Sequence, residues 1–132
     1  MLARREHSAF EIRRKLKQRD IADDEIEAAV ERLQHEGLLS DERYAESYIH
    51  MRMARGYGPL RIAIELRERG VAESVFGQYL YADNMDWASV LKAAYTKKYA
   101  NAACDSYREK AKRIRYLQYR GFALDQIHAL IE

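Results

Sequence analysis

Cysteine, proline and long apolar runs are all scarce in this sequence. Cys104 is the only cysteine, so the chain cannot form an internal disulfide, which is typical of a protein from a reducing compartment. No apolar run approaches the length of a membrane-spanning helix, and the first residues lack a signal-peptide pattern. We therefore predict a cytoplasmic protein without a membrane segment.

Strand patterns and catalytic motifs are missing as well. No segment alternates apolar and polar residues as a half-buried strand does. The four histidines are scattered without the spacing of a metal site, and Cys104 has no histidine near it in the sequence. Gly56 and Gly58 do not read as a phosphate loop, because they follow a predicted helix and lack the Lys-Ser/Thr ending. We expect an all-α protein that needs no metal or cofactor and is not an enzyme.

What the chain does contain is an internal repeat. Residues 66–72 read Leu-Arg-Glu-Arg-Gly-Val-Ala, and similar segments stand at residues 16–22 and 117–123, at offsets of 50 and 51 residues. Each copy predicts the end of a helix, a tight turn and the start of the next helix. The match continues beyond the turn, where Ile26, Phe76 and Ile127 correspond. A fixed period of this size is typical of stacked copies of one supersecondary unit.

Helical periodicity and capping signals divide the chain into three such units. Ser8 with Glu11 and Ser106 with Glu109 have capping-box spacing, and Pro59 suits the first turn of a helix. We predict eight or nine helices in three tandem three-helix bundles that form an elongated, curved body. The predicted units are residues 1–39, 40–82 and 83–132, and the first helix of the first unit, within residues 1–7, is expected to be truncated.

Charge is nearly balanced overall but is arranged in blocks. The net charge is +2, yet residues 4–19 carry seven lysines or arginines against two acids, and residues 92–120 carry nine against two. Residues 20–31 carry six acids and no base. Such blocks can guide a polyanion or a partner with the reverse pattern, although a solvated helical surface is the simpler interpretation of any single block. The candidate binding residues are Arg13, Arg14, Lys17, Arg52, Arg55, Tyr57, Arg61, Lys97, Lys98, Arg108, Lys112, Arg113 and Arg115.

An ordered set of strings resembles a known family. The strings are Arg-Glu-His-Ser at residues 5–8, Glu-Ile-Arg-Arg-Lys-Leu at 11–16, Gly-Leu-Leu-Ser-Asp-Glu-Arg-Tyr-Ala at 37–45, Gly-Tyr-Gly-Pro-Leu-Arg-Ile at 56–62 and Leu-Gln-Tyr-Arg-Gly-Phe at 117–122. In this order, over almost the whole chain, they resemble the RecX family, bacterial regulators of the recombinase RecA. The departures are an expected stretch before Leu2 that is missing, Ser40 where aspartate is more common, and Asp20 in place of the turn glycine.

The resemblance implies a three-repeat, all-helical modulator of RecA. Such a protein lies along the deep groove of the RecA–DNA filament, bridges successive protomers, and inhibits filament growth, strand exchange, ATPase and coprotease activity. We expect a monomer that binds single- and double-stranded DNA weakly on its own, with the basic residues above facing filament acids or DNA phosphates. The alternative is a general DNA-binding helical protein without a recombinase partner. Inhibition at concentrations too low to coat the DNA distinguishes the two.

Overall fold

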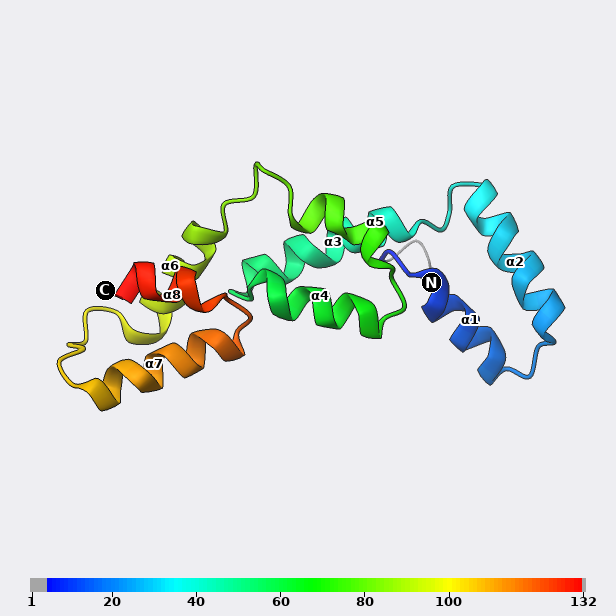
Figure 1. Ribbon diagram of the computed structural model, residues 1–132. Helices are drawn as coiled ribbons and strands as arrows, with labels where there is room; N and C mark the ends of the chain where they lie inside the picture. Colours follow the sequence, from blue (N-terminus) through cyan, green and yellow to red (C-terminus); the bar gives the residue numbers. More distant parts are fainter. Residues whose placement is uncertain (1–4, 132) are drawn as a thin grey trace.

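The computed structural model describes residues 5–131, which form eight α-helices and no β-strand. The predicted all-α class is therefore confirmed. The chain extends from α1 and α2 at one end of an elongated body to α6, α7 and α8 at the other (Figure 1). The helices are α1 (Ala9–Gln18), α2 (Asp23–His35), α3 (Asp41–Ala54), α4 (Pro59–Glu68), α5 (Glu73–Leu80), α6 (Trp87–Tyr99), α7 (Tyr107–Tyr119) and α8 (Leu124–Ile131).

The helices form three units, each with its own hydrophobic core. α1 packs on α2; α3 packs on α4 and α5; and α8 packs on α6 and α7. Helix α6 connects the second and third cores, because its Trp87 belongs to the second core and its Val90 packs against both. The most deeply buried core side chains are Val30 in the first unit, Ile49, Ile62, Leu66, Phe76 and Leu80 in the second, and Leu117, Phe122 and Ile127 in the third.

Local capping signals start several of these helices where the sequence predicts. The Ser8 hydroxyl accepts from the Glu11 N–H while the Glu11 carboxylate accepts from the Ser8 N–H, which completes a capping box on α1. The Ser106 hydroxyl accepts from the Glu109 N–H at the start of α7. Pro59 is the first residue of α4, where no N–H donor is needed.

The first unit contains two described helices rather than three. Residues 5–8 lead into α1 without helical structure, so the truncated helix predicted within residues 1–7 does not cover residues 5–7, and residues 1–4 lie outside the described part. His7 in this lead-in is buried. Its ring lies 3.2 Å from the Arg5 carbonyl through Nδ1 and 3.3 Å from the Lys15 ammonium through Nε2. Burial, with the charges of Arg5 and Lys15, lowers the pKa of His7.

The repeated turn keeps one backbone shape in all three units. Gly70 between α4 and α5 has a φ of 77°, and Gly121 between α7 and α8 has a φ of 105°. Asp20 between α1 and α2 has a φ of 59°. Aspartate tolerates this left-handed region better than most residues with a side chain, so the turn persists without glycine.

The first unit joins the second through the start of α1. The Ser8 hydroxyl donates to the Arg69 carbonyl over 3.1 Å, and the Phe10 side chain lies directly against Gly70. We call this contact of the α1 start with the α4–α5 turn the first joint.

The second unit joins the third in the equivalent way. The Gly58 N–H donates to the Arg120 carbonyl over 2.8 Å, and the Leu60 N–H donates to the Gly121 carbonyl over 3.0 Å. Gly58 stands 50 residues after Ser8, so the start of α4 meets the α7–α8 turn just as the start of α1 meets the α4–α5 turn. We call this contact the second joint. The sequence period thus sets both the units and the way in which they join.

Candidate partner-binding surfaces

Helices α1 and α7, which carry many of the predicted basic residues, lie along one long edge of the molecule. The corresponding helices of the three units, α1, α4 and α7, follow one another along this edge, which is the lower one in Figure 1. On α7, Arg108, Lys112 and Arg115 are all exposed at a spacing that places them on one helix face. On α1, Arg14 is exposed. The predicted basic residues of these two helices are therefore accessible to a partner.

Two of the predicted α1 cations pair with the acidic helix beside them. Arg13 Nε lies 2.8 Å from Glu27 Oε2, and Lys17 Nζ lies 2.7 Å from Asp23 Oδ1. All four side chains are largely exposed, and such surface pairs contribute little to stability. The acidic block of residues 20–31 therefore partly neutralises the basic block before it, and leaves both cations accessible.

The middle helix of the edge, α4, exposes an apolar patch. Leu60 is 50% exposed, Ile64 is 53% exposed, and the neighbouring Tyr119 is 71% exposed. Sequence reasoning missed this patch. The signal was present, however, because Ile64 occupies the repeat position of Arg14 and Arg115, which face solvent. The edge thus carries exposed cations on both end helices and an apolar patch on the middle helix.

Two predicted binding residues, Arg52 and Arg61, are held by a half-buried carboxylate. Glu65 Oε2 lies 2.9 Å from Arg52 Nη2 and 3.1 Å from Arg61 Nε, and Glu65 Oε1 accepts from the Tyr48 hydroxyl over 2.8 Å. Burial alone would raise the pKa of Glu65, but the hydrogen bonds from Arg52, Tyr48 and Arg61 outweigh it and lower that pKa. Burial and the bond to Glu65 raise the pKa of Tyr48 to about 12. Arg52 and Tyr48 of α3 thus hold α3 against α4, whereas Arg61 pairs with Glu65 within α4.

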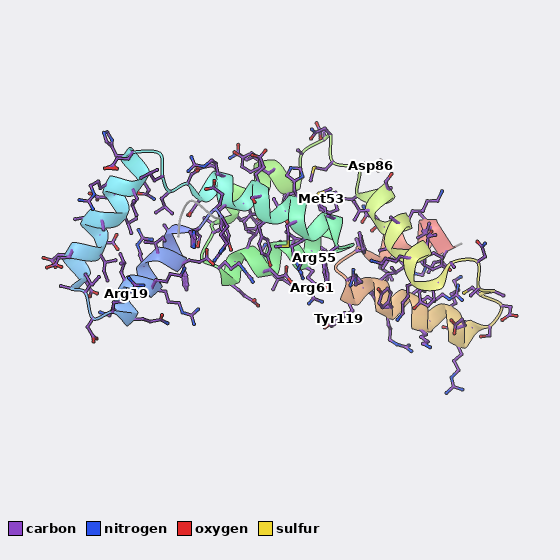
Figure 2. All side chains as sticks on the ribbon, turned by 180° about the vertical axis from the view of Figure 1, so that it is seen from behind. Arg19, Met53, Arg55, Arg61, Asp86 and Tyr119 are labelled. Atoms are coloured by element: carbon purple, nitrogen blue, oxygen red, sulfur yellow. The ribbon has the colours of Figure 1, made fainter. Side chains whose placement is uncertain are left out.

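Tyr57 lies at the centre of three arginines in the second joint. The guanidinium carbons of Arg52, Arg120 and Arg61 are 3.7, 3.9 and 4.8 Å from its ring centroid. This stacking stabilises the joint and occupies the ring, which therefore offers no free surface for a base. Figure 2 shows Arg61 at this joint, whereas Arg19, the repeat counterpart of Arg120, lies at the far end of α1.

Arg113, also a predicted binding residue, is buried. Its side chain is 2% exposed, its Nε lies 3.0 Å from Glu109 Oε1, and it donates to the Tyr95 hydroxyl over 2.7 Å and to the Ala103 carbonyl over 2.9 Å. It fastens the loop between α6 and α7 to α7, and we remove it from the candidate surface. The repeat already gave this signal, since Arg113 stands at the position of the buried Ile62.

The remaining three predicted residues meet in one hollow. Arg55, Lys97 and Lys98 line a groove of about 540 Å³ between the C-terminal end of α3, helix α6 and the C-terminal end of α7, which we call the α3–α6 groove. Arg120 completes its basic rim and Tyr116 lies beside it, and neither was among the predicted binding residues. The apolar residues that line it are Met53, Ala54, Val90, Ala93 and Ala94.

Metal and membrane sites are not found in the described part of the chain. Residues 5–131 contain no cluster of His, Cys, Asp and Glu side chains that could hold a metal ion. No helix among them is both long and apolar enough to cross a membrane. Cys104 is a half-buried free cysteine in the loop between α6 and α7.

Comparison with known proteins identifies the family. Models of the first, second and third three-helix domains of RecX match residues 1–33, 40–80 and 86–131. The regulatory protein RecX of Ectopseudomonas mendocina (strain ymp) is 44% identical over 99% of this chain and 87% of its own. The chain belongs to the RecX family. The regulatory protein RecX of Pseudomonas putida (strain W619) is likewise 45% identical over 99% of this chain and 84% of its own.

Solved RecX structures share the fold. The crystal structure of RecX from Lactobacillus salivarius matches with a TM-score of 0.82 and 27% identity, over 98% of this chain and 86% of that one. A second RecX crystal structure matches with a TM-score of 0.79 and 24% identity, over 96% of this chain and 64% of that one. The resemblance, the helical three-unit fold and the assignment to regulatory proteins rather than enzymes are confirmed.

Proposed function

We propose that this RecX-family protein binds along the groove of a RecA–DNA filament and bridges successive RecA subunits. By doing so it inhibits filament growth, strand exchange, ATPase and coprotease activity. The observation that carries this proposal is the arrangement of α1, α4 and α7 along one edge (Figure 1). A filament repeats the same surface at regular intervals, so a chain of equivalent units can contact several subunits with equivalent faces.

The charge along the edge supports a partner that contains nucleic acid. Arg14 on α1 and the three exposed cations of α7 can meet DNA phosphates or acidic side chains of the filament. The exposed Leu60 and Ile64 between them favour a protein contact at the middle of the edge, because a polyphosphate gains nothing from an apolar surface. A mixed surface of this kind suits a protein–DNA filament better than bare DNA.

Charge reversal on α7 tests the proposal. The double variant Lys112→Glu with Arg115→Glu should weaken inhibition of the ATPase activity of RecA on single-stranded DNA by about tenfold or more, because both side chains are exposed on the helix proposed to face the filament. Helical content by circular dichroism should not change. A matched control is Arg32→Glu with Lys92→Glu, which makes the same charge change at exposed positions on α2 and α6, away from the edge. Full inhibition by the α7 variant would contradict the proposal.

The general DNA-binding alternative predicts a different dose dependence. A protein that acts on the DNA inhibits only when it covers the strand, whereas a filament-bound regulator acts at concentrations far below that. Titrating inhibition at a fixed RecA concentration with increasing excess DNA separates the two. A half-inhibitory concentration that rises in proportion to the DNA would favour the alternative.

We further propose that the protein acts as a monomer in the bacterial cytoplasm and binds DNA only weakly by itself. The cellular location follows from the partner, because a recombinase filament forms on chromosomal DNA. Weak DNA binding follows from the net charge of only +2 and from the acids of α2 beside the basic α1 helix. Sedimentation velocity and titration of a labelled oligonucleotide measure both properties.

A further inference from the structure

The α3–α6 groove combines unpaired cations with an apolar floor. Among the described residues that line it are four cations and no carboxylate. Arg55, Lys97 and Lys98 are exposed and have no carboxylate partner in the described chain, unlike Arg52 and Arg61, which Glu65 holds. The positive potential of the groove is therefore available to a ligand.

The floor of the groove has the shape of a socket for a large apolar side chain. Three of its residues, Ala54, Ala93 and Ala94, are small, and this leaves the volume between α3 and α6 open. Met53, labelled at the end of α3 in Figure 2, is flexible and can adapt to what enters. Small residues around an adaptable methionine are suited to an aliphatic or aromatic anchor, the group that carries most of the binding energy in protein interfaces.

The aromatic ring at the groove does not provide a stacking platform for a base. The Lys98 ammonium lies 5.2 Å from the Tyr116 ring centroid, and the Arg120 guanidinium carbon lies 5.9 Å from it. Tyr99 meets the same ring edge-on, with centroids 5.8 Å apart. Single-stranded nucleic acid binds by stacking bases on free aromatic faces, and this ring is already in contact with three side chains. The geometry therefore favours a polypeptide over a nucleic-acid strand.

We propose that the α3–α6 groove binds a segment of a partner protein in which one large apolar side chain is flanked by carboxylates. The apolar side chain enters between Met53 and Ala93, and the carboxylates meet Lys97, Lys98 and Arg55 at the rim. This inference rests on the proposed function, since the segment belongs to the filament-forming recombinase subunit. It assigns the groove to protein contact and leaves DNA phosphates to the cations of α1 and α7.

Filling the socket tests the inference without changing charge. Ala93→Trp places an indole in the groove from an exposed helix position, and Ala88→Trp makes the same substitution at an exposed position of α6 outside the groove. Binding is measured to RecA filaments stabilised by a non-hydrolysable nucleotide and, in parallel, to a labelled oligo-dT strand. Ala93→Trp should weaken filament binding by about tenfold or more and leave oligo-dT binding within about twofold of wild type, because a blocked anchor site removes a hot spot. Ala88→Trp should match wild type in both assays.

A charge variant tests the rim independently. Lys97→Glu with Lys98→Glu should weaken filament binding, and the loss should combine less than additively with Ala93→Trp, because both variants remove the same contact. Equal losses of filament and oligo-dT binding by Ala93→Trp would make the groove a nucleic-acid site and overturn the inference. If Ala93→Trp changed the sedimentation of the protein in the absence of filaments, the groove would be an interface between two copies of the chain, and the inference would also be overturned.

Failure of the inference and failure of the proposed function are distinguishable. If wild type binds filaments and Ala93→Trp binds them equally well, the groove is not the contact and only the inference falls. If wild type itself does not bind filaments, both fall.

Discussion

The two joints share a register but use different chemistry. In the first joint, the Ser8 hydroxyl bonds to the next unit, and the adjacent Ala9 N–H donates to the Asp41 carboxylate over 2.8 Å. In the second joint, the backbone N–H groups of Gly58 and Leu60 make the contact, and three arginines stack around a tyrosine beside it. The repeat period fixes where one unit meets the next, and the side chains that make the contact are free to differ.

The comparison also explains where glycine is required. An added Cβ at Gly70 would lie 2.3 Å from Phe10 Cβ, and one at Gly121 would lie 2.5 Å from Arg61 Cβ. Asp20, at the same turn of the first unit, is exposed and receives no other unit in the described structure. Glycine is therefore needed at the joints mainly because a residue of the neighbouring unit packs against the turn, and only secondarily because φ is positive.

The largest expected effect is at the second joint. Gly121→Ala adds a methyl group 2.7 Å from the Arg61 backbone nitrogen at a φ of 105°, and should lower the free energy of unfolding by about 3 kcal/mol. Gly37→Ala also has a positive φ, but nothing lies within 4 Å of the added Cβ, so it should cost about 1 kcal/mol. Urea unfolding followed by circular dichroism measures both. Equal costs would show that the backbone angle alone matters.

Aspartate should destabilise the protein at Gly70 in the first joint, although the α1–α2 turn carries aspartate at the corresponding position, Asp20. Gly70→Asp should lower the free energy of unfolding by about 2 kcal/mol through its collision with Phe10, whereas Asp20→Gly should change it by about 0.5 kcal/mol or less. Adding Phe10→Ala to Gly70→Asp should recover part of the loss, because the collision partner is gone. A double variant that is simply additive would argue against direct contact.

The ion pairs of Glu65 in the middle unit should contribute more to the free energy of unfolding than the exposed Arg13–Glu27 pair of the first unit. Glu65→Gln leaves two half-buried arginines without their counterion and should cost about 2 kcal/mol. Glu27→Gln removes the exposed pair with Arg13 and should cost about 0.5 kcal/mol or less. The same unfolding titration compares them, and added salt should reduce the Glu27 effect further while changing the Glu65 effect little.

The smallest expected effect is a pH dependence at the first joint. The pKa of His7 is lowered in the folded state, so below its ordinary value of 6.5 the unfolded chain binds more protons and stability falls as pH falls. Protonation of Nε2 also removes the acceptor for the Lys15 ammonium. His7→Gln should flatten this dependence between neutral pH and pH 5. An unchanged slope in the variant would assign the effect to another group.

Elements with local signals were predictable from the sequence. The three turns, the capping box of α1 and the Ser106 cap of α7 depend on residues close together in the chain, and they occur where predicted. Arg113 shows how a correct signal can be overlooked: its place in a basic block suggested exposure, but its repeat position is that of Ile62, which is fully buried. Helical phase decides burial more reliably than local composition does.

Contacts between distant helices had no such signal. The cluster around Glu65 brings α3 and α4 together, and the α3–α6 groove needs residues of two units, including Arg120. Neither arrangement follows from spacing along one helix, because each depends on how two helices cross. The sequence identified Arg55, Lys97 and Lys98 as candidate binding residues. That they line the same groove depends on how the second and third units pack together.

The first unit keeps its own hydrophobic interior, whereas α6 of the third unit places Trp87 in the core of the second and packs Val90 against both. Flexing at the first joint therefore strains a few hydrogen bonds but uncovers little apolar surface, whereas flexing at the second joint also disturbs the packing of Trp87. The molecule can therefore change its curvature at the first joint without losing the fold of either neighbouring unit.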